Sequence, residues 1–214
     1  MRQIKPALFT IVDKKLKENG AAQKAIEEKD ARSLLVYAAE ACVGETEEGK
    51  DNYGTFVELC QKTVDNEAKG ESWCMGFVQS MISYVETKLE ISSPVATSEN
   101  CLKVWKNTHK SKIVKQIPKR GAIAIWRDVS NSQKLDSPID SDRKIYKGKG
   151  HTGFVLEYDY NLKVKTMKTV EGNTNVAGSG TRDGVFRRND RKKKRNIGKL
   201  RSCRFYNSFL SLNC

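Results

Sequence analysis

The spacing of apolar residues changes from helical to strand-like near Pro118, and this change limits the fold more than any other feature of the chain. Before Pro118, apolar residues recur at intervals of three and four, as on one face of a helix. After it, "AIAIWR" (122–127) and "HTGFVLEYD" (151–159) have the short apolar runs typical of strands. Helices followed by an antiparallel sheet indicate an α+β domain, and 214 residues suffice for one core.

Capping signals and glycines divide the helical half into five predicted helices. Asn19-Gly20 has the residue types of a helix C-terminus, and Asp30 those of an N-cap. The predicted helices cover residues 5–18, 31–43, 55–68, 73–89 and about 99–105.

The second half predicts a hairpin, a long surface loop and two weaker strands. "HTGFVLEYD" and "KVKTMKTVEGN" (163–173) are the hairpin strands, joined at "YDYN". Residues 128–150 are polar and rich in turn residues, which favours a surface loop. "GVFRR" (184–188) and "SCRFYN" (202–207) are the weaker strands.

Cys74 begins the helix predicted over 73–89, in the stretch "GESWCMGFVQSM". The N–H groups at a helix N-terminus favour a thiolate, which is the reactive form of cysteine. Glu71 and Ser72 offer a cap for this end. Cys74 also begins an apolar stripe, so it is either the first core residue of the helix or a nucleophile. The stripe itself continues through Phe77, Val78, Met81, Ile82 and Val85.

A nucleophilic cysteine needs an imidazole base and an acceptor that orients the imidazole. His151 opens the first hairpin strand, whereas Glu171 and Asn173 close the second. Antiparallel strands bring such distant ends together, so we expect His151 to lie beside "EGN". Taken singly, the histidine could be a surface residue and "EGN" an ordinary turn.

Four motifs in this order resemble the CHAP family, the cysteine, histidine-dependent amidohydrolase/peptidase domains. They are "GESWCMGFVQSMISYV", "PKRGAIAIW", "GHTGFVLEYD" and "TVEGNTN", and the similarity covers residues 32 to 190. "GNTN" followed by "GSGTRDGVFRR" also resembles a branch common in phage and prophage lysis genes.

The resemblance implies a papain-like α+β fold in which Cys74 is the nucleophile and His151 the general base. Glu171 would orient the imidazolium, Asn173 would add a polar group, and Trp73 would contact substrate. The implied activity is that of a peptidoglycan hydrolase, an amidase or endopeptidase that needs no cofactor. On this basis we expect an N-terminal helical extension at residues 1–30 and a catalytic domain at 31–214.

Metal sites are not predicted. The six cysteines form no C-x-x-C pair, and there are only two histidines, so a structural zinc site is not expected. Some members of the family bind calcium, but the spacing of the acidic residues in "ETEEGKDNYG" does not fit a calcium loop. The scattered cysteines are expected to be reduced thiols.

The net charge of +13 predicts an anionic partner, such as an anionic cell-wall or envelope polymer. Much of this charge lies in "RRNDRKKKRNIGKLR" (187–201). Neither a transmembrane segment nor a signal peptide is predicted. We therefore expect a monomer made in the cytoplasm that acts on the cell wall after release, as a phage or prophage endolysin does.

Two alternative functions stay open. An exported antibacterial effector would keep the same chemistry and have an immunity partner. A basic nucleic-acid-binding protein would use "RKKKR", but no aromatic residues alternate with these basic ones, which disfavours it.

Overall fold

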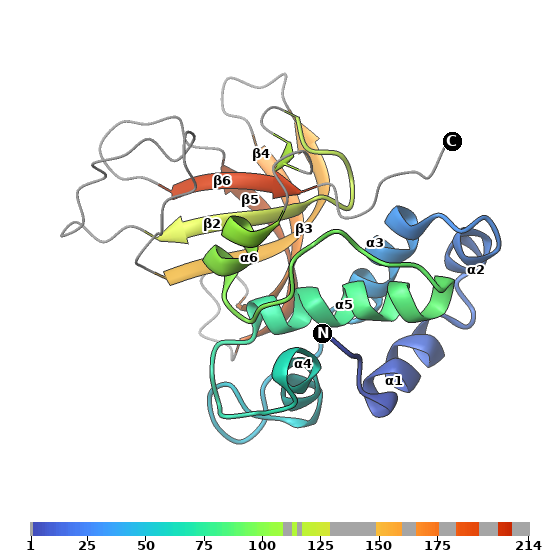
Figure 1. Ribbon diagram of the computed structural model, residues 1–214, viewed down its shortest axis with the longest axis horizontal. Helices are drawn as coiled ribbons and strands as arrows, with labels where there is room; N and C mark the ends of the chain where they lie inside the picture. The colour runs from blue at the N-terminus through green and yellow to red at the C-terminus, as the bar shows by residue number, and fades with distance from the viewer. Residues whose placement is uncertain are drawn as a thin grey trace.

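The computed structural model describes residues 2–108, 113–114, 117–128, 149–159, 166–175, 183–192 and 201–206. Within these ranges, helices precede strands, which confirms the α+β class (Figure 1). The helices are α1 (Pro6–Leu16), α2 (Gly20–Glu27), α3 (Ala31–Ala41), α4 (Thr55–Asp65), α5 (Cys74–Leu89) and α6 (Cys101–Asn107). The strands are β1 (Ile113–Val114), β2 (Ile123–Asp128), β3 (Lys149–Asp159), β4 (Thr166–Thr174), β5 (Gly184–Lys192) and β6 (Arg201–Tyr206).

The strands form one antiparallel sheet in the order β1-β6-β2-β3-β4-β5. The predicted hairpin is confirmed as the pair β3 and β4, in which Phe154 lies opposite Val170. Both weaker strands are also present, as β5 and β6. The predicted turn at "YDYN" lies partly outside the described residues, and so do residues 129–148 of the predicted surface loop.

Helix α5 is the central helix of the domain (Figure 1). It packs against β3 and β4 of the sheet and against α3 and α4. The predicted apolar stripe is buried, but so is the rest of the helix surface from Cys74 to Val85. Polar residues on the other faces have partners in the core: the Ser80 hydroxyl donates to the Thr63 hydroxyl of α4 at 2.9 Å, and the Ser83 hydroxyl accepts from the Ile4 N–H at 2.9 Å. Tertiary contacts therefore fix α5 from every side.

The caps of the N-terminal helices differ from the prediction at one point. The side chain of Asn19 accepts from the Ala22 N–H at 3.1 Å and so begins α2, a helix that the sequence analysis missed. The predicted C-terminal signal at Asn19-Gly20 was therefore wrong. Asp30 is confirmed as an N-cap, since it accepts from the N–H groups of Arg32 and Ser33.

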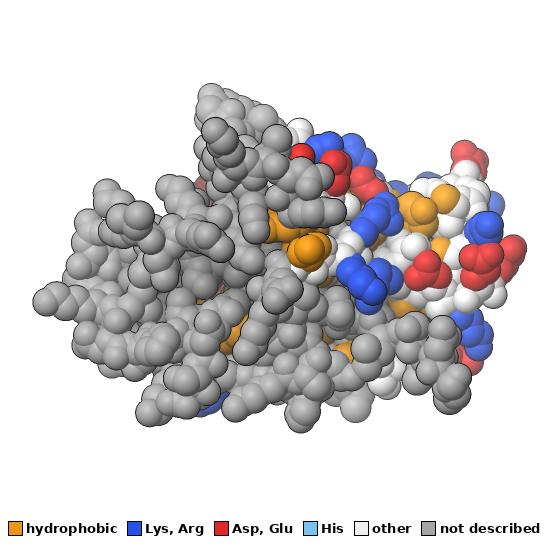
Figure 2. Space-filling model, turned by 90° about the horizontal axis from the view of Figure 1, so that it is seen from above, with side chains coloured by type: hydrophobic (Ala, Val, Ile, Leu, Met, Phe, Trp, Pro, Cys, Tyr) orange, Lys and Arg blue, Asp and Glu red, His pale blue; other side chains and the backbone are white. Residues whose placement is uncertain are grey.

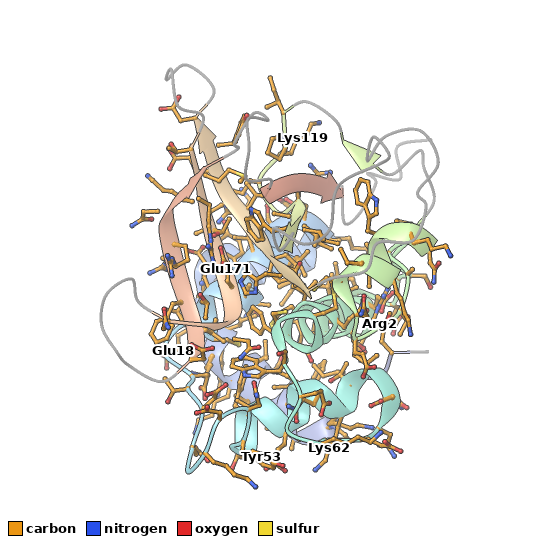
Figure 3. The ribbon with its side chains drawn as sticks, turned by 90° about the vertical axis from the view of Figure 1, so that its left-hand side faces the viewer. Arg2, Glu18, Tyr53, Lys62, Lys119 and Glu171 are labelled. Carbon is orange, nitrogen blue, oxygen red and sulfur yellow. The ribbon has the colours of Figure 1, made fainter. Side chains whose placement is uncertain are left out.

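Residues 2–27 belong to the same core as α5. Leu8, Val12 and Leu16 are buried in the main apolar cluster. Arg2, which Figure 3 shows close to α5, donates to Glu86 and Gln79 of that helix at 2.8 Å. This segment therefore supports the helix that carries Cys74, while a domain boundary at residue 30 stays a prediction.

The sheet has a second, smaller apolar cluster on the face opposite the main core. Successive residues of β2 point to opposite faces, so Ile123 and Ile125 lie in the main core, whereas Ala124 and Trp126 lie in the second cluster. Trp126 is thereby placed beside the residues described next. Among the described residues, no helix is both long and apolar enough to span a membrane.

A candidate cysteine active site

Cys74 is the first residue of α5, as predicted, but its helix is not capped as predicted. The N-cap position is occupied by Trp73 and not by Glu71 or Ser72, and no side chain at this position accepts a hydrogen bond from the first turn. The Glu71 carboxylate instead accepts from the Lys69 N–H at 2.7 Å. The Trp73 N–H donates to Oδ1 of Asn173 on β4, at 3.2 Å. A long-range contact with the sheet thus holds the end of the helix that carries Cys74.

His151 and Glu171 lie side by side on β3 and β4, as the hairpin prediction required. The distance between His151 Nε2 and Glu171 Oε2 is 2.8 Å. Gly153 makes this contact possible, because a Cβ at that position would lie 2.5 Å from Glu171 Cγ. Since Nε2 faces Glu171, the imidazole has Nδ1 for its hydrogen bond with Cys74.

Glu171 is fully buried and its two carboxylate oxygens accept three further contacts (Figure 3). The Thr169 hydroxyl donates to Oε1 at 2.5 Å, and Arg191 Nε donates to the same oxygen at 2.7 Å. A terminal nitrogen of Arg191 also forms an ion pair with Oε2. The carboxylate is therefore fixed in position and ionised, with one oxygen directed at His151.

Trp126 covers one face of the imidazole. Its ring is stacked on His151 with the centroids 5.8 Å apart, and the two residues are opposite each other on β2 and β3. The guanidinium of Arg191 lies 5.2 Å from the centre of the Trp126 ring. His151 is thus held by an acceptor at Nε2 and an aromatic plane, while 28% of its side chain stays exposed.

A second thiol, that of Cys101 at the start of α6, lies next to the Cys74 thiol. The two Sγ atoms are 3.8 Å apart and both residues are buried. The hydrogen bond with Cys101 and the hydrogen bond and charge of His151 outweigh burial, and they hold the pKa of Cys74 well below its usual range. The pKa of Cys101 is raised instead, by the neighbouring Cys74 sulfur and by burial. Cys101 is therefore the protonated thiol that donates, and Cys74 the thiolate that accepts.

The pKa of the His151 imidazole is raised and the pKa of the Glu171 carboxyl is lowered, so both groups are charged at neutral pH. Burial alone would lower the pKa of His151, but its hydrogen bonds with Cys74 and Glu171 raise that pKa to about 9. Burial would raise the pKa of Glu171, yet Arg191 and His151 together lower it to about 2. At neutral pH the site therefore holds a thiolate, an imidazolium and a carboxylate in sequence.

The contacts of Trp73 and Asn173 hold the start of α5 against the sheet. Trp73 is fully buried, packs edge-on against Phe56 and donates from Nε1 to Glu47 at 3.0 Å. Its side chain offers no surface to a substrate in this structure, so we assign it to the support of Cys74 instead. The Asn173 amide nitrogen lies 3.2 Å from Asn52 Oδ1 and 3.3 Å from Glu47 Oε1.

Replacing Asn173 by alanine is expected to lower the free energy of unfolding by about 2 kcal/mol, because the Trp73 N–H loses its acceptor and alanine disfavours a φ of +54°. The melting temperature should fall by about 4–8 °C in a thermal unfolding experiment. Asn66→Ala is the matched control, since Asn66 has a φ of +73° but caps no helix N-terminus. Equal destabilisation by both substitutions would contradict a stabilising role for the contact between the Trp73 N–H and Asn173.

Two arginines in the described part of the basic segment form ion pairs with acidic residues of the fold. Arg187 of β5 forms an ion pair with Glu40 of α3, and Arg191 binds Glu171. On the face shown in Figure 2, acidic and basic side chains are intermingled over the described residues. Residues 193–200, which contain "KKRNIGKL", lie outside the described residues, as does His109.

Cys42, Cys60, Cys74 and Cys101 are free thiols, and the side chains of Cys203 and Cys214 lie outside the described part of the chain. Within that part, no group of three or more histidine, cysteine or acidic side chains is arranged to hold a metal ion.

Sequence reasoning placed Cys74, His151 and Glu171 in one site but missed Arg191, Thr169, Trp126 and Cys101. Comparison of the chain with protein-family models, with curated proteins and with solved structures found no match. A function must therefore be inferred from the residues of the site and from the resemblance stated above.

Proposed function

We propose that this protein is a cysteine-dependent peptidoglycan hydrolase, an amidase or endopeptidase with the biological role of a phage or prophage endolysin. The observation that supports it most is the contact series from Cys74 through His151 to Glu171 at the N-terminus of α5. This arrangement has the nucleophile, base and orienting acceptor that acyl transfer requires. The choice of peptidoglycan as substrate, and of a papain-like CHAP fold, comes from the resemblance of the four motifs.

The proposed mechanism uses the charges of the resting site. The Cys74 thiolate attacks the amide carbonyl, and the His151 imidazolium gives its proton to the leaving amine. The neutral imidazole then accepts a proton from water, which hydrolyses the thioester. Glu171 accepts from Nε2 throughout and keeps Nδ1 directed at the sulfur.

The oxyanion of the tetrahedral intermediate is expected to accept from the Cys74 N–H. The first hydrogen bond of α5 runs from the Phe77 N–H to the Trp73 carbonyl, so the N–H groups before Phe77 have no acceptor within the helix. Donors fixed in this way stabilise the charge that develops in the transition state.

The experiment that tests the function is digestion of purified sacculi, followed by mass spectrometry of the released muropeptides. The proposal expects new termini at one type of bond, either the amide between sugar and stem peptide or a peptide bond. Sacculi from several bacteria should be used, because the preferred wall is not specified by the site. Intact sacculi in every case, with a folded enzyme whose Cys74 reacts with iodoacetamide, would overturn the choice of substrate.

A further inference from the structure

The Cys101 thiol forms and breaks no bond in the hydrolysis described above, although its sulfur lies 3.8 Å from that of Cys74 and it helps to lower the pKa of Cys74. The two cysteines are the first residues of α5 and α6, which are separated by the segment 90–100. Gly150 of β3 accommodates Cys101 here, because a Cβ at position 150 would lie 2.8 Å from Cys101 Cβ. The fold thus places a second thiol beside the sulfur that must be free for catalysis.

We propose that Cys74 and Cys101 form a peroxide-sensitive thiol pair, in which a hydroperoxide oxidises Cys74 and Cys101 then closes a disulfide with it. The sulfur atoms of a disulfide are about 2.05 Å apart, so the two side chains must rotate toward each other about their Cα–Cβ bonds. Both residues are largely buried, which disfavours a disulfide between either of them and another protein.

The two steps balance in atoms and electrons. The Cys74 thiolate attacks the O–O bond, which breaks; the sulfur becomes a sulfenic acid, and the leaving alkoxide or hydroxide takes the proton of His151. The neutral imidazole then removes the Cys101 proton, and the Cys101 thiolate attacks the Cys74 sulfur. The hydroxide released takes the proton back from His151 and leaves as water. In sum, two thiols are oxidised to a disulfide, and the hydroperoxide is reduced to an alcohol or water.

The division of roles follows from the site. Cys74 is the thiolate of the pair, and a thiolate reacts with peroxides faster than a thiol does. Cys101 stays protonated until the imidazole is neutral, so it acts second. Disulfide formation would prevent further oxidation of Cys74 to a sulfinic acid, which dithiothreitol does not reverse, whereas the disulfide itself can be reduced.

Tryptic peptide mapping of the full-length protein tests this pair directly. Each of the six cysteines lies on its own tryptic peptide, with Cys74 on residues 70–88 and Cys101 on residues 89–103. The reduced protein is treated with hydrogen peroxide, unfolded and alkylated, then digested without reductant. We expect the main oxidised product to be peptide 70–88 joined to 89–103, and dithiothreitol to release both. Oxidised Cys74 with an alkylated Cys101, a link from Cys74 to another cysteine, or an unreacted Cys74 would overturn the proposal.

Two variants separate this pair from general oxidation. After peroxide treatment, dithiothreitol makes part of Cys74 available for alkylation again. In Cys101→Ala this recovered fraction should be at least about tenfold smaller than in the wild type. Cys60→Ala, which removes another buried thiol, should keep the link between 70–88 and 89–103. Restoration equal to the wild type in Cys101→Ala would contradict the role of Cys101, and the wild-type peptide map decides the question if that variant does not fold.

The effect of oxidation on activity rests on the proposed hydrolase function. Formation of the disulfide does not depend on that function. If that function holds, lysis of sacculi should stop on oxidation and return with dithiothreitol. A correct link without any lysis before or after treatment would leave the thiol pair established and would contradict only the hydrolase.

Discussion

The Cys74→Ala protein is expected to lose lysis of purified sacculi by at least about a thousandfold while remaining folded. No other described thiol can take its place, because the His151 contact is made to Cys74 and the pKa of Cys101 is raised. Alanine removes the sulfur without adding volume to the buried start of α5. Turbidity loss of a sacculus suspension gives the rate, and circular dichroism checks the fold.

Cys60→Ala is a suitable control for this loss, because Cys60 is also buried but lies in α4 and has no contact with His151 in the described site. It should lower stability somewhat through the lost core packing, yet retain lysis at a temperature where it is folded. Full lysis by Cys74→Ala would end the assignment of Cys74 as nucleophile.

The Glu171→Gln protein is expected to lose about two to four orders of magnitude in turnover, without complete loss of activity. Each carboxylate oxygen accepts from a donor: Oε1 from Thr169 and Arg191, and Oε2 from His151. A glutamine amide replaces one oxygen by a donor, so one of these contacts becomes a repulsion between N–H groups. The imidazolium also loses its negative neighbour, which lowers its pKa.

The same substitution should change how stability depends on pH. The pKa of Glu171 is lowered to about 2, so the carboxylate stabilises the folded state above its unfolded pKa of about 4.3, and this stabilisation is lost as the pH falls through 2. The difference in unfolding free energy between wild type and Glu171→Gln should be on the order of 3 kcal/mol at pH 7 and should shrink below about pH 4. Urea titrations at both pH values measure it, and a difference that is independent of pH would contradict the account of this carboxylate.

The fold class and most element boundaries followed from local patterns in the sequence. Helix α5 was placed correctly because its apolar spacing and the preceding Gly70 agree. Helix α2 was missed because Asn-Gly suits either end of a helix, and only tertiary structure selects the N-cap role of Asn19. The apolar spacing of α5 did not predict that the helix is buried on all sides, because Gln79 and Ser80 are polar. Both side chains have hydrogen-bond partners in the core.

The proximity of Cys74, His151 and Glu171 was predictable, whereas the residues that support them were not. His151 and Glu171 are linked by one hairpin, so pairing of antiparallel strands suffices to bring them together. Arg191 reaches Glu171 from β5 across a pair with irregular register, and it lies in a run of basic residues that resembles a solvated surface. Cys101 is brought to Cys74 by the packing of α6 against β2 and β3, which no spacing in the sequence indicates.

The central claim is that Cys74 is a thiolate paired with the His151 imidazolium, and the pH dependence of its alkylation tests this most directly. The rate of iodoacetamide modification is measured on tryptic peptide 70–88 across the pH range, for the wild type and for His151→Ala. In the wild type we expect the midpoint of this rate to lie well below the ordinary thiol pKa of about 8.5. In His151→Ala the midpoint should move up by at least about one pH unit. A wild-type midpoint near 8.5 that His151→Ala leaves unchanged would contradict the account.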